Sequence, residues 1–179
     1  MKFSRAEIPD IIIVEPNVYS DHRGHFFESY NEKELIDFIG YKINFCQDNE
    51  SKSSYGVLRG LHYQVKPFEQ AKLVRVIKGS VLDVAVDIRK NSLTFGKHIS
   101  IELNDINKKQ LFIPRGFAHG FIVLSETAIF SYKVDNFYNK ISERGIRYDD
   151  KILGIDWKLP QTEIKLSFKD QNSQALLSI

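Results

Sequence analysis

Four residues with reactive side chains lie in segments where a half-buried strand would normally carry apolar residues. Lys72 and Tyr132 each alternate with apolar neighbours, so each shares a strand face with residues expected in the core. Arg59 and His62 would point to opposite faces of a regular strand, but a bulge at Gly60 would bring both to one face. An imidazole, an ammonium and a phenol on neighbouring strands are suited to moving protons.

Each of these residues taken alone is more typical of a structural role. A strand histidine is usually a satisfied core residue, a strand lysine usually extends to solvent, and a buried tyrosine usually packs. The joint presence of all three types favours a site that removes and returns protons.

The elements that must position these residues are predicted to be strands. Short stretches rich in β-branched and aromatic residues alternate apolar and polar side chains, and closely spaced turn signals separate them. These stretches are residues 42–47, 57–64, 72–77, 81–88, 99–103 and 127–134. Such spacing favours antiparallel hairpins and predicts a sandwich or barrel. One helix is predicted over 32–39, with Asn31 as its N-cap and Gly40 at its C-terminal end.

Composition limits the class of protein. The chain of 179 residues has no repeat or linker, so we predict one domain over residues 1–179. Its 25 basic and 23 acidic residues give a formal charge of +2, which argues against a nucleic-acid partner. No apolar run is long enough for a membrane span or signal peptide, so no membrane partner is expected. The single cysteine, Cys46, cannot form an internal disulfide, so we expect a cytoplasmic protein.

One segment indicates a particular barrel. Residues 114–120, PRGFAHG, resemble the second motif of the cupin jelly roll, in which a proline–glycine turn leads a histidine into a strand. The first cupin motif corresponds to residues 62–64, HYQ, where metal-binding cupins have a second histidine in place of Gln64. In the second motif, this chain has Val123 where metal-binding cupins have asparagine. Because a glutamine carbonyl replaces imidazole poorly, we predict no metal. We interpret His22, His25 and His98 as structural or surface residues.

An ordered series of motifs along the whole chain resembles the dTDP-4-dehydrorhamnose 3,5-epimerase family. In order, they are DHRGHFFE at 21–28, QDN at 47–49, GVLRGLHYQ at 56–64, QAKLVRV at 70–76, IPRGFAHGF at 113–121, YK at 132–133, NFY at 136–138, SERGI at 142–146, GIDW at 154–157 and SFKD at 167–170. The resemblance implies an all-β, cupin-like jelly-roll barrel with a few short peripheral helices. It also implies a homodimer without a cofactor that acts on a dTDP-linked 4-keto-6-deoxyhexose.

The chemistry implied by this resemblance uses the groups already identified. Protons on carbons 3 and 5, both next to the C4 ketone, would be removed and returned to the opposite faces. His62 would be the general base and Asp170 would orient it. Lys72 would stabilise the charge on the C4 oxygen of the enolate, and Tyr132 would donate a proton from the other face.

The resemblance also implies binding residues. Arg23, Arg59 and His119 would contact the pyrophosphate and sugar, with Arg23 reaching the partner's site. Tyr19 and Tyr138 would stack on the thymine, and Asp83 would support Lys72. The remaining substrate-binding positions are Phe26, Glu28, Gln47, Asn49, Glu143 and Lys169. For Tyr19, Glu143 and Lys169, an ordinary surface role is an equal alternative.

Three other functions stay open at the level of the sequence. A relative that inverts only C3 or only C5 would use the same base in a differently shaped pocket. A metal-dependent cupin enzyme is disfavoured by Gln64. A nucleotide-sugar-binding barrel without activity would have no reason to keep His62, Lys72, Tyr132 and Asp170 together. The chain also departs from the family pattern: Lys140, Lys151 and Lys158 stand where prolines are common, and Tyr148 stands where tryptophan is frequent. Loss of the prolines is expected to loosen the C-terminal loops.

Overall fold

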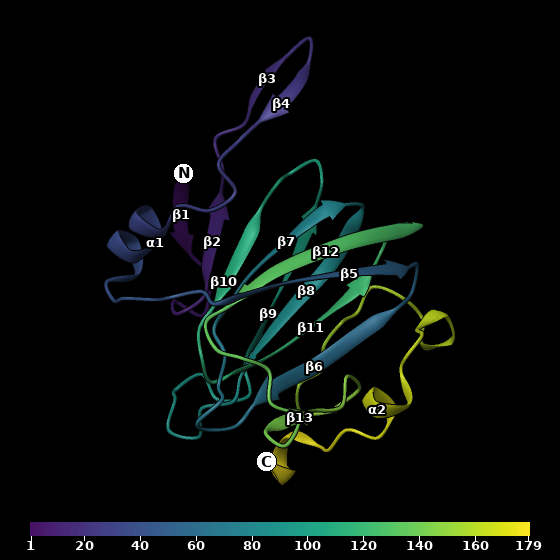
Figure 1. Cartoon of the computed structure of the whole chain (residues 1–179). Coiled ribbons are helices and arrows are strands. Elements are labelled where there is room, and N and C mark those ends of the chain that lie inside the picture. Colours follow the sequence, from purple (N-terminus) through teal and green to yellow (C-terminus); the bar gives the residue numbers. More distant parts are fainter.

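Two antiparallel sheets, packed face to face, form the body of the protein in a computed structural model that describes residues 1–179 (Figure 1). The first sheet has the strand order β1-β2-β10-β7-β12-β5, with β1 Lys2–Arg5, β2 Ile12–Glu15, β10 Gln110–Ile113, β7 Lys72–Lys78, β12 Thr127–Val134 and β5 Gln47–Ser54. The second has the order β13-β6-β11-β8-β9, with β13 Glu143–Gly145, β6 Leu58–Gln64, β11 Phe117–Val123, β8 Ser80–Asp87 and β9 His98–Asn104. The predicted antiparallel, double-sheet architecture is therefore confirmed.

The core has three parts because both sheets bury both faces. The central cluster fills the space between the sheets and includes Phe121 and Phe130, whose rings stack with centroids 4.2 Å apart. A second cluster lies between the five-stranded sheet and the C-terminal segment around Trp157. A third lies between the six-stranded sheet and the helix that carries Leu35. Burial on both faces is the reason why β8, β10 and β11 are almost continuously buried.

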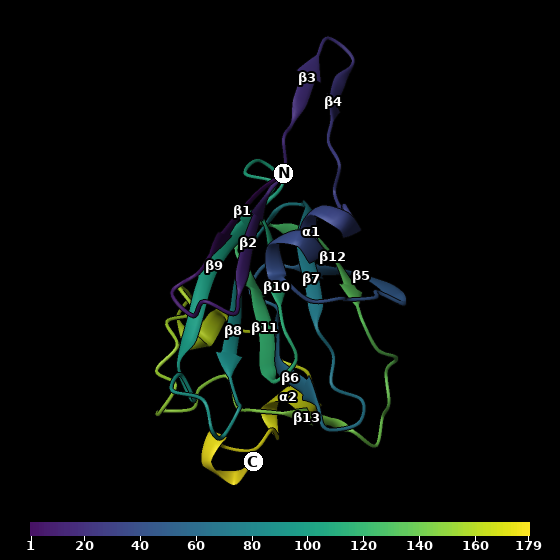
Figure 2. The ribbon, with the colours of Figure 1, turned by 90° about the vertical axis from the view of Figure 1, so that its left-hand side faces the viewer.

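The helices are short and peripheral, as expected. Helix α1, Glu32–Ile39, begins where Asn31 accepts a hydrogen bond from the Glu34 amide and ends at Gly40, which has a φ of +82°. Helix α2, Phe168–Gln171, lies beside β6 in the C-terminal segment (Figure 2). Two 3₁₀ turns, Gln161–Glu163 and Leu176–Ser178, complete the helical elements. No helix is both long enough and apolar enough to cross a membrane.

One strand prediction was wrong. Of residues 42–47 only Gln47 belongs to a strand, and the edge strand β5 runs instead through the polar sequence QDNESKSS. Ile43 in the preceding segment contributes to the cluster under α1, which explains the apolar pattern there. The inner face of β5 carries Gln47, Asn49, Ser51 and Ser53, since these residues pair with the inward-facing residues of β12. A strand that lines a polar pocket and forms a sheet edge has no apolar face, so it gives no periodic signal.

A hairpin of β3, Tyr19–Asp21, and β4, Gly24–Phe26, projects from the barrel (Figures 1 and 2). Every residue of both strands is exposed, and Phe26 is 67% exposed. A hairpin with two exposed aromatic rings and no packing against its own barrel is typical of an interaction surface.

Candidate active site

A cavity of about 330 Å³ lies between the two sheets and collects the residues that the sequence indicated for proton transfer. His62 reaches it from β6 of one sheet, while Lys72 and Tyr132 reach it from β7 and β12 of the other. Its other walls are Gln47, Asn49, Tyr63, Gln64, Gln70, Tyr138 and Glu143. A basic imidazole and a phenol thus face one cavity from opposite walls.

An irregularity at Gly60 turns His62 into this cavity. His62 pairs with His119 of β11, but Arg59 pairs with Phe121, so two residues of β6 oppose the single residue Gly120. The predicted bulge is confirmed, and Arg59 and His62 lie on the same, inner face of β6. Gly60 is required here because its φ is +137° and an added Cβ would lie 2.5 Å from the Gly120 Cα.

The ring of His62 is held by Asp170, which is 108 residues away in the sequence. His62 Nε2 lies 2.5 Å from Asp170 Oδ1. Ser167 Oγ donates to the other carboxylate oxygen over 2.8 Å and also accepts the Asp170 amide as the N-cap of α2. Burial opposes the charge on Asp170, but the bonds from His62 and Ser167 outweigh it, and the pKa of Asp170 is lowered. Because a carboxylate only accepts, Nε2 of His62 carries the proton and Nδ1 is left free as a base.

Lys72 is a half-buried ammonium on the cavity wall. It shares the inner face of β7 with Val74 and Val76 of the central cluster, as the alternation predicted. Burial lowers the pKa of Lys72 to about 8, although the negative charges of Asp83 and Glu143 act to raise it. Asp83, which was expected to support Lys72, hydrogen-bonds to His119 Nε2 at 2.9 Å and acts on Lys72 through charge alone. Burial also lowers the pKa of His119, which favours its neutral form.

Tyr132 remains a neutral acid in this environment. Burial raises the pKa of its hydroxyl, while the Arg59 guanidinium opposes the shift and Glu143 adds to it. Arg59 itself is exposed, with its Nε bonded to Ser53 Oγ at 3.0 Å. The phenol thus keeps its proton at neutral pH and can donate it to a strongly basic centre.

A polar group at the mouth of the cavity comes from the C-terminal third of the chain. The Tyr138 hydroxyl donates to Glu143 over 2.8 Å, and Glu143 forms an ion pair with Lys169. Burial opposes the charge on Glu143, but these two partners outweigh it and lower its pKa. On the β5 wall of the same cavity, the Gln47 side-chain amide donates to Asn49 Oδ1 over 2.7 Å. The structure therefore brings five of the expected binding residues together around one opening.

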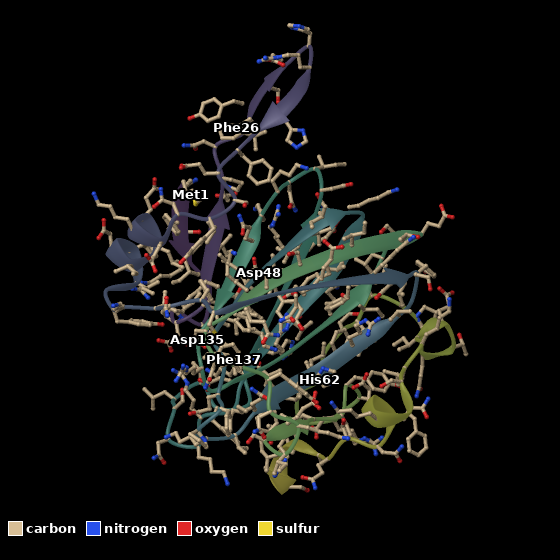
Figure 3. All side chains as sticks on the ribbon, viewed as in Figure 1. Met1, Phe26, Asp48, His62, Asp135 and Phe137 are labelled. Atoms are coloured by element: carbon tan, nitrogen blue, oxygen red, sulfur yellow. The ribbon has the colours of Figure 1, made fainter.

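Four expected binding residues lie on the projecting hairpin or just after it and do not reach this cavity in their own chain. Arg23 lies on the projecting hairpin and pairs with Asp21, its neighbour in the same turn. Phe26 ends the hairpin, and Figure 3 shows it well apart from His62. Glu28 follows in the exposed segment beyond it. Tyr19, on the other hairpin strand, is also exposed and away from the cavity.

Sequence reasoning missed Ser53 and Ser167 and gave Gln64 no role in the site. The spacing of Ser167 and Asp170 matches a helix N-cap pattern, so this signal was available. No sequence signal indicates Ser53, because its bond to Arg59 joins two strands. The nitrogen and the oxygen of the Gln64 side-chain amide are both hydrogen-bonded to backbone groups.

The structure contains no cluster of three or more His, Cys, Asp or Glu residues that could hold a metal ion.

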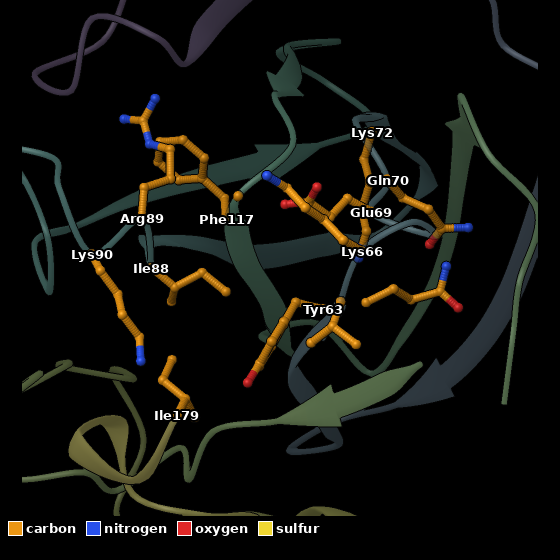
Figure 4. Close-up of a pocket in the computed structure, with 13 residues that line it drawn as sticks. Tyr63, Lys66, Glu69, Gln70, Lys72, Ile88, Arg89, Lys90, Phe117 and Ile179 are labelled. Carbon is orange, nitrogen blue, oxygen red and sulfur yellow. The ribbon is translucent and has the colours of Figure 1, made fainter. Parts of the chain in front are cut away.

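A second cavity of about 520 Å³ adjoins the first and shares the wall formed by Tyr63, Gln64, Gln70 and Lys72 (Figure 4). Ile88, Phe117 and Ile179 give it an apolar side, and neither His62 nor Tyr132 lines it. Of these two cavities, only the smaller is lined by both His62 and Tyr132.

The chain matches a family model described as dTDP-4-dehydrorhamnose 3,5-epimerase over residues 5–178. It is 55% identical to the dTDP-4-dehydrorhamnose 3,5-epimerase of Shigella flexneri over 174 residues, which cover 97% of this chain and 95% of that protein. A crystal structure of the enzyme of that name from Elizabethkingia anophelis superposes with a TM-score of 0.96 at 55% identity, over 99% of this chain and 97% of that one. A dTDP-6-deoxy-D-glucose-3,5-epimerase from Legionella pneumophila, in complex with dTDP-4-keto-L-rhamnose, has a TM-score of 0.96 at 46% identity, over 99% and 94%.

Proposed function

Since the chain belongs to the dTDP-4-dehydrorhamnose 3,5-epimerase family, we propose that the cavity between its sheets is the active site, with His62, Asp170, Lys72 and Tyr132 as its working groups. The chain is a carbohydrate isomerase. It inverts C3 and C5 of dTDP-4-dehydro-6-deoxy-D-glucose to give dTDP-4-dehydro-L-rhamnose, a step in the synthesis of dTDP-L-rhamnose.

The observation that carries the proposed roles is the placement of His62 and Tyr132 on opposite walls of one cavity. Inversion requires that a proton leave one face of the sugar carbon and arrive at the other. His62 Nδ1 would take the proton next to the C4 ketone, and the Asp170 carboxylate would stabilise the imidazolium that forms. Tyr132 would then protonate the carbon from the far side.

The intermediate would be an enolate, whose charge gathers on the C4 oxygen. The Lys72 ammonium reaches the cavity from the strand next to Tyr132, where a fixed positive charge would stabilise that oxygen. Because both proton transfers leave the oxidation state unchanged, the reaction needs no redox cofactor.

We assign nucleotide binding to the opening of the cavity. Tyr138 would stack on the thymine, and Gln47, Asn49, Glu143 and Lys169 would line the nucleotide and sugar site. Arg59 would bind the pyrophosphate from its exposed position beside the cavity, and His119 would act from the buried wall behind it.

We further propose a homodimer in which the projecting hairpin completes the partner's site. Arg23, Phe26 and Glu28 belong to the expected binding set but lie away from their own cavity. The hairpin has exposed aromatic rings and packs on nothing in its own chain, so a second copy would bury them. A single domain over residues 1–179 and a cytoplasmic location remain predictions.

The test is deuterium uptake in D2O. We expect NMR of dTDP-4-dehydro-6-deoxy-D-glucose incubated with the protein to show deuterium at both C3 and C5, and His62→Ala to abolish it. Label at one carbon alone would identify a single-centre relative, and no label at either would overturn the proposed roles. Metal-stripped protein should retain the full rate, whereas a metal-dependent cupin enzyme would lose it.

A further inference from the structure

The side chain of Gln64 bonds to the backbone on both sides of Tyr138. Gln64 ends β6 and is only 7% exposed. Its Nε2 donates to the carbonyl of Phe137 over 3.2 Å and to that of Phe68 over 2.7 Å. Its Oε1 accepts the amide N–H of Asn139 over 2.6 Å. One buried amide therefore holds the residue before Tyr138 and the residue after it.

The ring of Tyr138 depends on this backbone for its position. Tyr138 is 54% exposed, so packing does not fix its ring, and the single hydrogen bond of its side chain is the one to Glu143. Residues 137–139 belong to no strand or helix that could supply a regular ladder. Their backbone is held by isolated hydrogen bonds instead, and the Gln64 side chain provides two of them.

We propose that Gln64 is a positioning residue that presets the Tyr138 ring for stacking on the nucleotide base. The inference rests on the proposed function, because it assumes that the base lies on Tyr138. A planar amide suits this role because its nitrogen donates to two carbonyls while its oxygen accepts an N–H, whereas a neutral histidine has only one N–H donor. With the ring ordered on folding, less conformational entropy is lost when the nucleotide binds.

The first test is Gln64→Met, which keeps the length of the side chain and removes all three bonds. Stacking on the base contributes equally to the bound substrate and to the transition state. We therefore expect KM for the dTDP-sugar to rise about tenfold, with kcat within about twofold of the wild type. The matched control is Gln110→Met, because Gln110 is also buried and bonds a backbone carbonyl, that of Ser29, away from the cavity. It should leave KM unchanged.

A double-mutant cycle separates this role from general loosening. If Gln64 acts through Tyr138, adding Gln64→Met to Tyr138→Ala should raise KM no further than Tyr138→Ala alone. Additive effects, an unchanged KM, or a fall in kcat without a rise in KM would each overturn the proposal.

Amide hydrogen exchange gives a readout that does not depend on turnover. In the unliganded protein, the Asn139 amide should exchange about tenfold faster in Gln64→Met than in the wild type. Gln64→Glu keeps an oxygen that can accept the Asn139 N–H but loses both donors to the Phe68 and Phe137 carbonyls, so it should restore only part of that protection. Unchanged Asn139 exchange in Gln64→Met would refute the inference. A wild type that exchanges no deuterium into the sugar would instead refute the proposed function.

Discussion

At the residue scale, the site depends on groups whose charge is set by their surroundings. Lys72 is a cation placed on an apolar strand face, where burial lowers its pKa to about 8. Asp170 is a buried carboxylate that stays charged because His62 and Ser167 bond to it. Tyr132 keeps its proton because burial raises its pKa. The three shifts favour a neutral acid, a charged orienting group and a lysine that titrates just above neutral pH.

The pKa of Lys72 predicts an alkaline limit to activity. Only the protonated amine can stabilise the enolate oxygen, so kcat/KM should fall as the pH rises through about 8. The pH profile of Lys72→Arg provides the control, because a guanidinium stays charged throughout this range. That variant should be slower overall but show no decline near pH 8. A decline that persists in Lys72→Arg would assign it to a different group.

The same shift predicts that Lys72 destabilises the fold. Its pKa falls from 10.5 in the unfolded chain to about 8 in the folded one, so the folded state disfavours the charged form. Lys72→Met should therefore be inactive yet more stable than the wild type by ~1–3 kcal/mol at pH 7. The gain should shrink between pH 8 and 10.5, as the wild-type amine loses its proton in both states. Urea unfolding at pH 7 and pH 10 measures both values, and equal stability of the two proteins at pH 7 would contradict the prediction.

At the scale of elements, the contact between β6 and β11 decides which way His62 points. Two glycines, Gly60 and Gly120, let the two backbones approach closely at the bulge. The shift in register places Arg59 and His62 on the inner face together. A regular strand would turn one of them away from the cavity.

Gly60→Ala should disturb both the fold and the site. The new Cβ would lie 2.5 Å from the Gly120 Cα and 3.0 Å from the His119 carbonyl oxygen, on a backbone with a φ of +137°. We expect a loss of more than ~2 kcal/mol in unfolding free energy, together with a large loss of kcat in the protein that remains folded. Gly154→Ala is the matched control, since its φ is +56° but its Cβ would meet nothing within 4 Å. Similar losses in both variants would show that backbone strain alone, without the close strand contact, explains the effect.

At the scale of the whole molecule, the two sheets and the hairpin contribute different parts of the site. Each sheet supplies one wall of the cavity, so acid and base approach the substrate from opposite sides. The hairpin of β3 and β4 carries expected binding residues away from that cavity (Figure 3). A complete site would then need two chains.

Subunit mixing tests this division. Arg23→Ala and His62→Ala homodimers should each be nearly inactive. If Arg23 acts in the partner's site, a mixed dimer has one site with both residues intact, so random exchange of subunits should restore roughly a quarter of wild-type activity. If Arg23 acts in its own chain, mixing restores nothing. Sedimentation velocity on the mixture confirms that dimers have formed.

Local patterns in the sequence determined five of the strands, the helix α1 and the inner face of several strands. Residues 127–134 alternate cleanly and form β12 with the same bounds, and the Asn31 and Gly40 caps fix α1. Alternation also placed Lys72 and Tyr132 on inward faces, because a strand's side chains follow a period of two whatever its partner is.

The tertiary structure decided which residues from distant parts of the sequence face one another. The edge strand β5 could not be predicted, because its inner face lines the cavity with polar residues and therefore shows no apolar alternation. The bond from His62 to Asp170 spans 108 residues, and Gln64 reaches Asn139 across 75. The sequence alone could assign Asp170 and the hairpin residues only by resemblance to a family. Periodicity reports which face of one strand is buried, whereas closure of two sheets around a cavity brings distant residues together, and that information is not local.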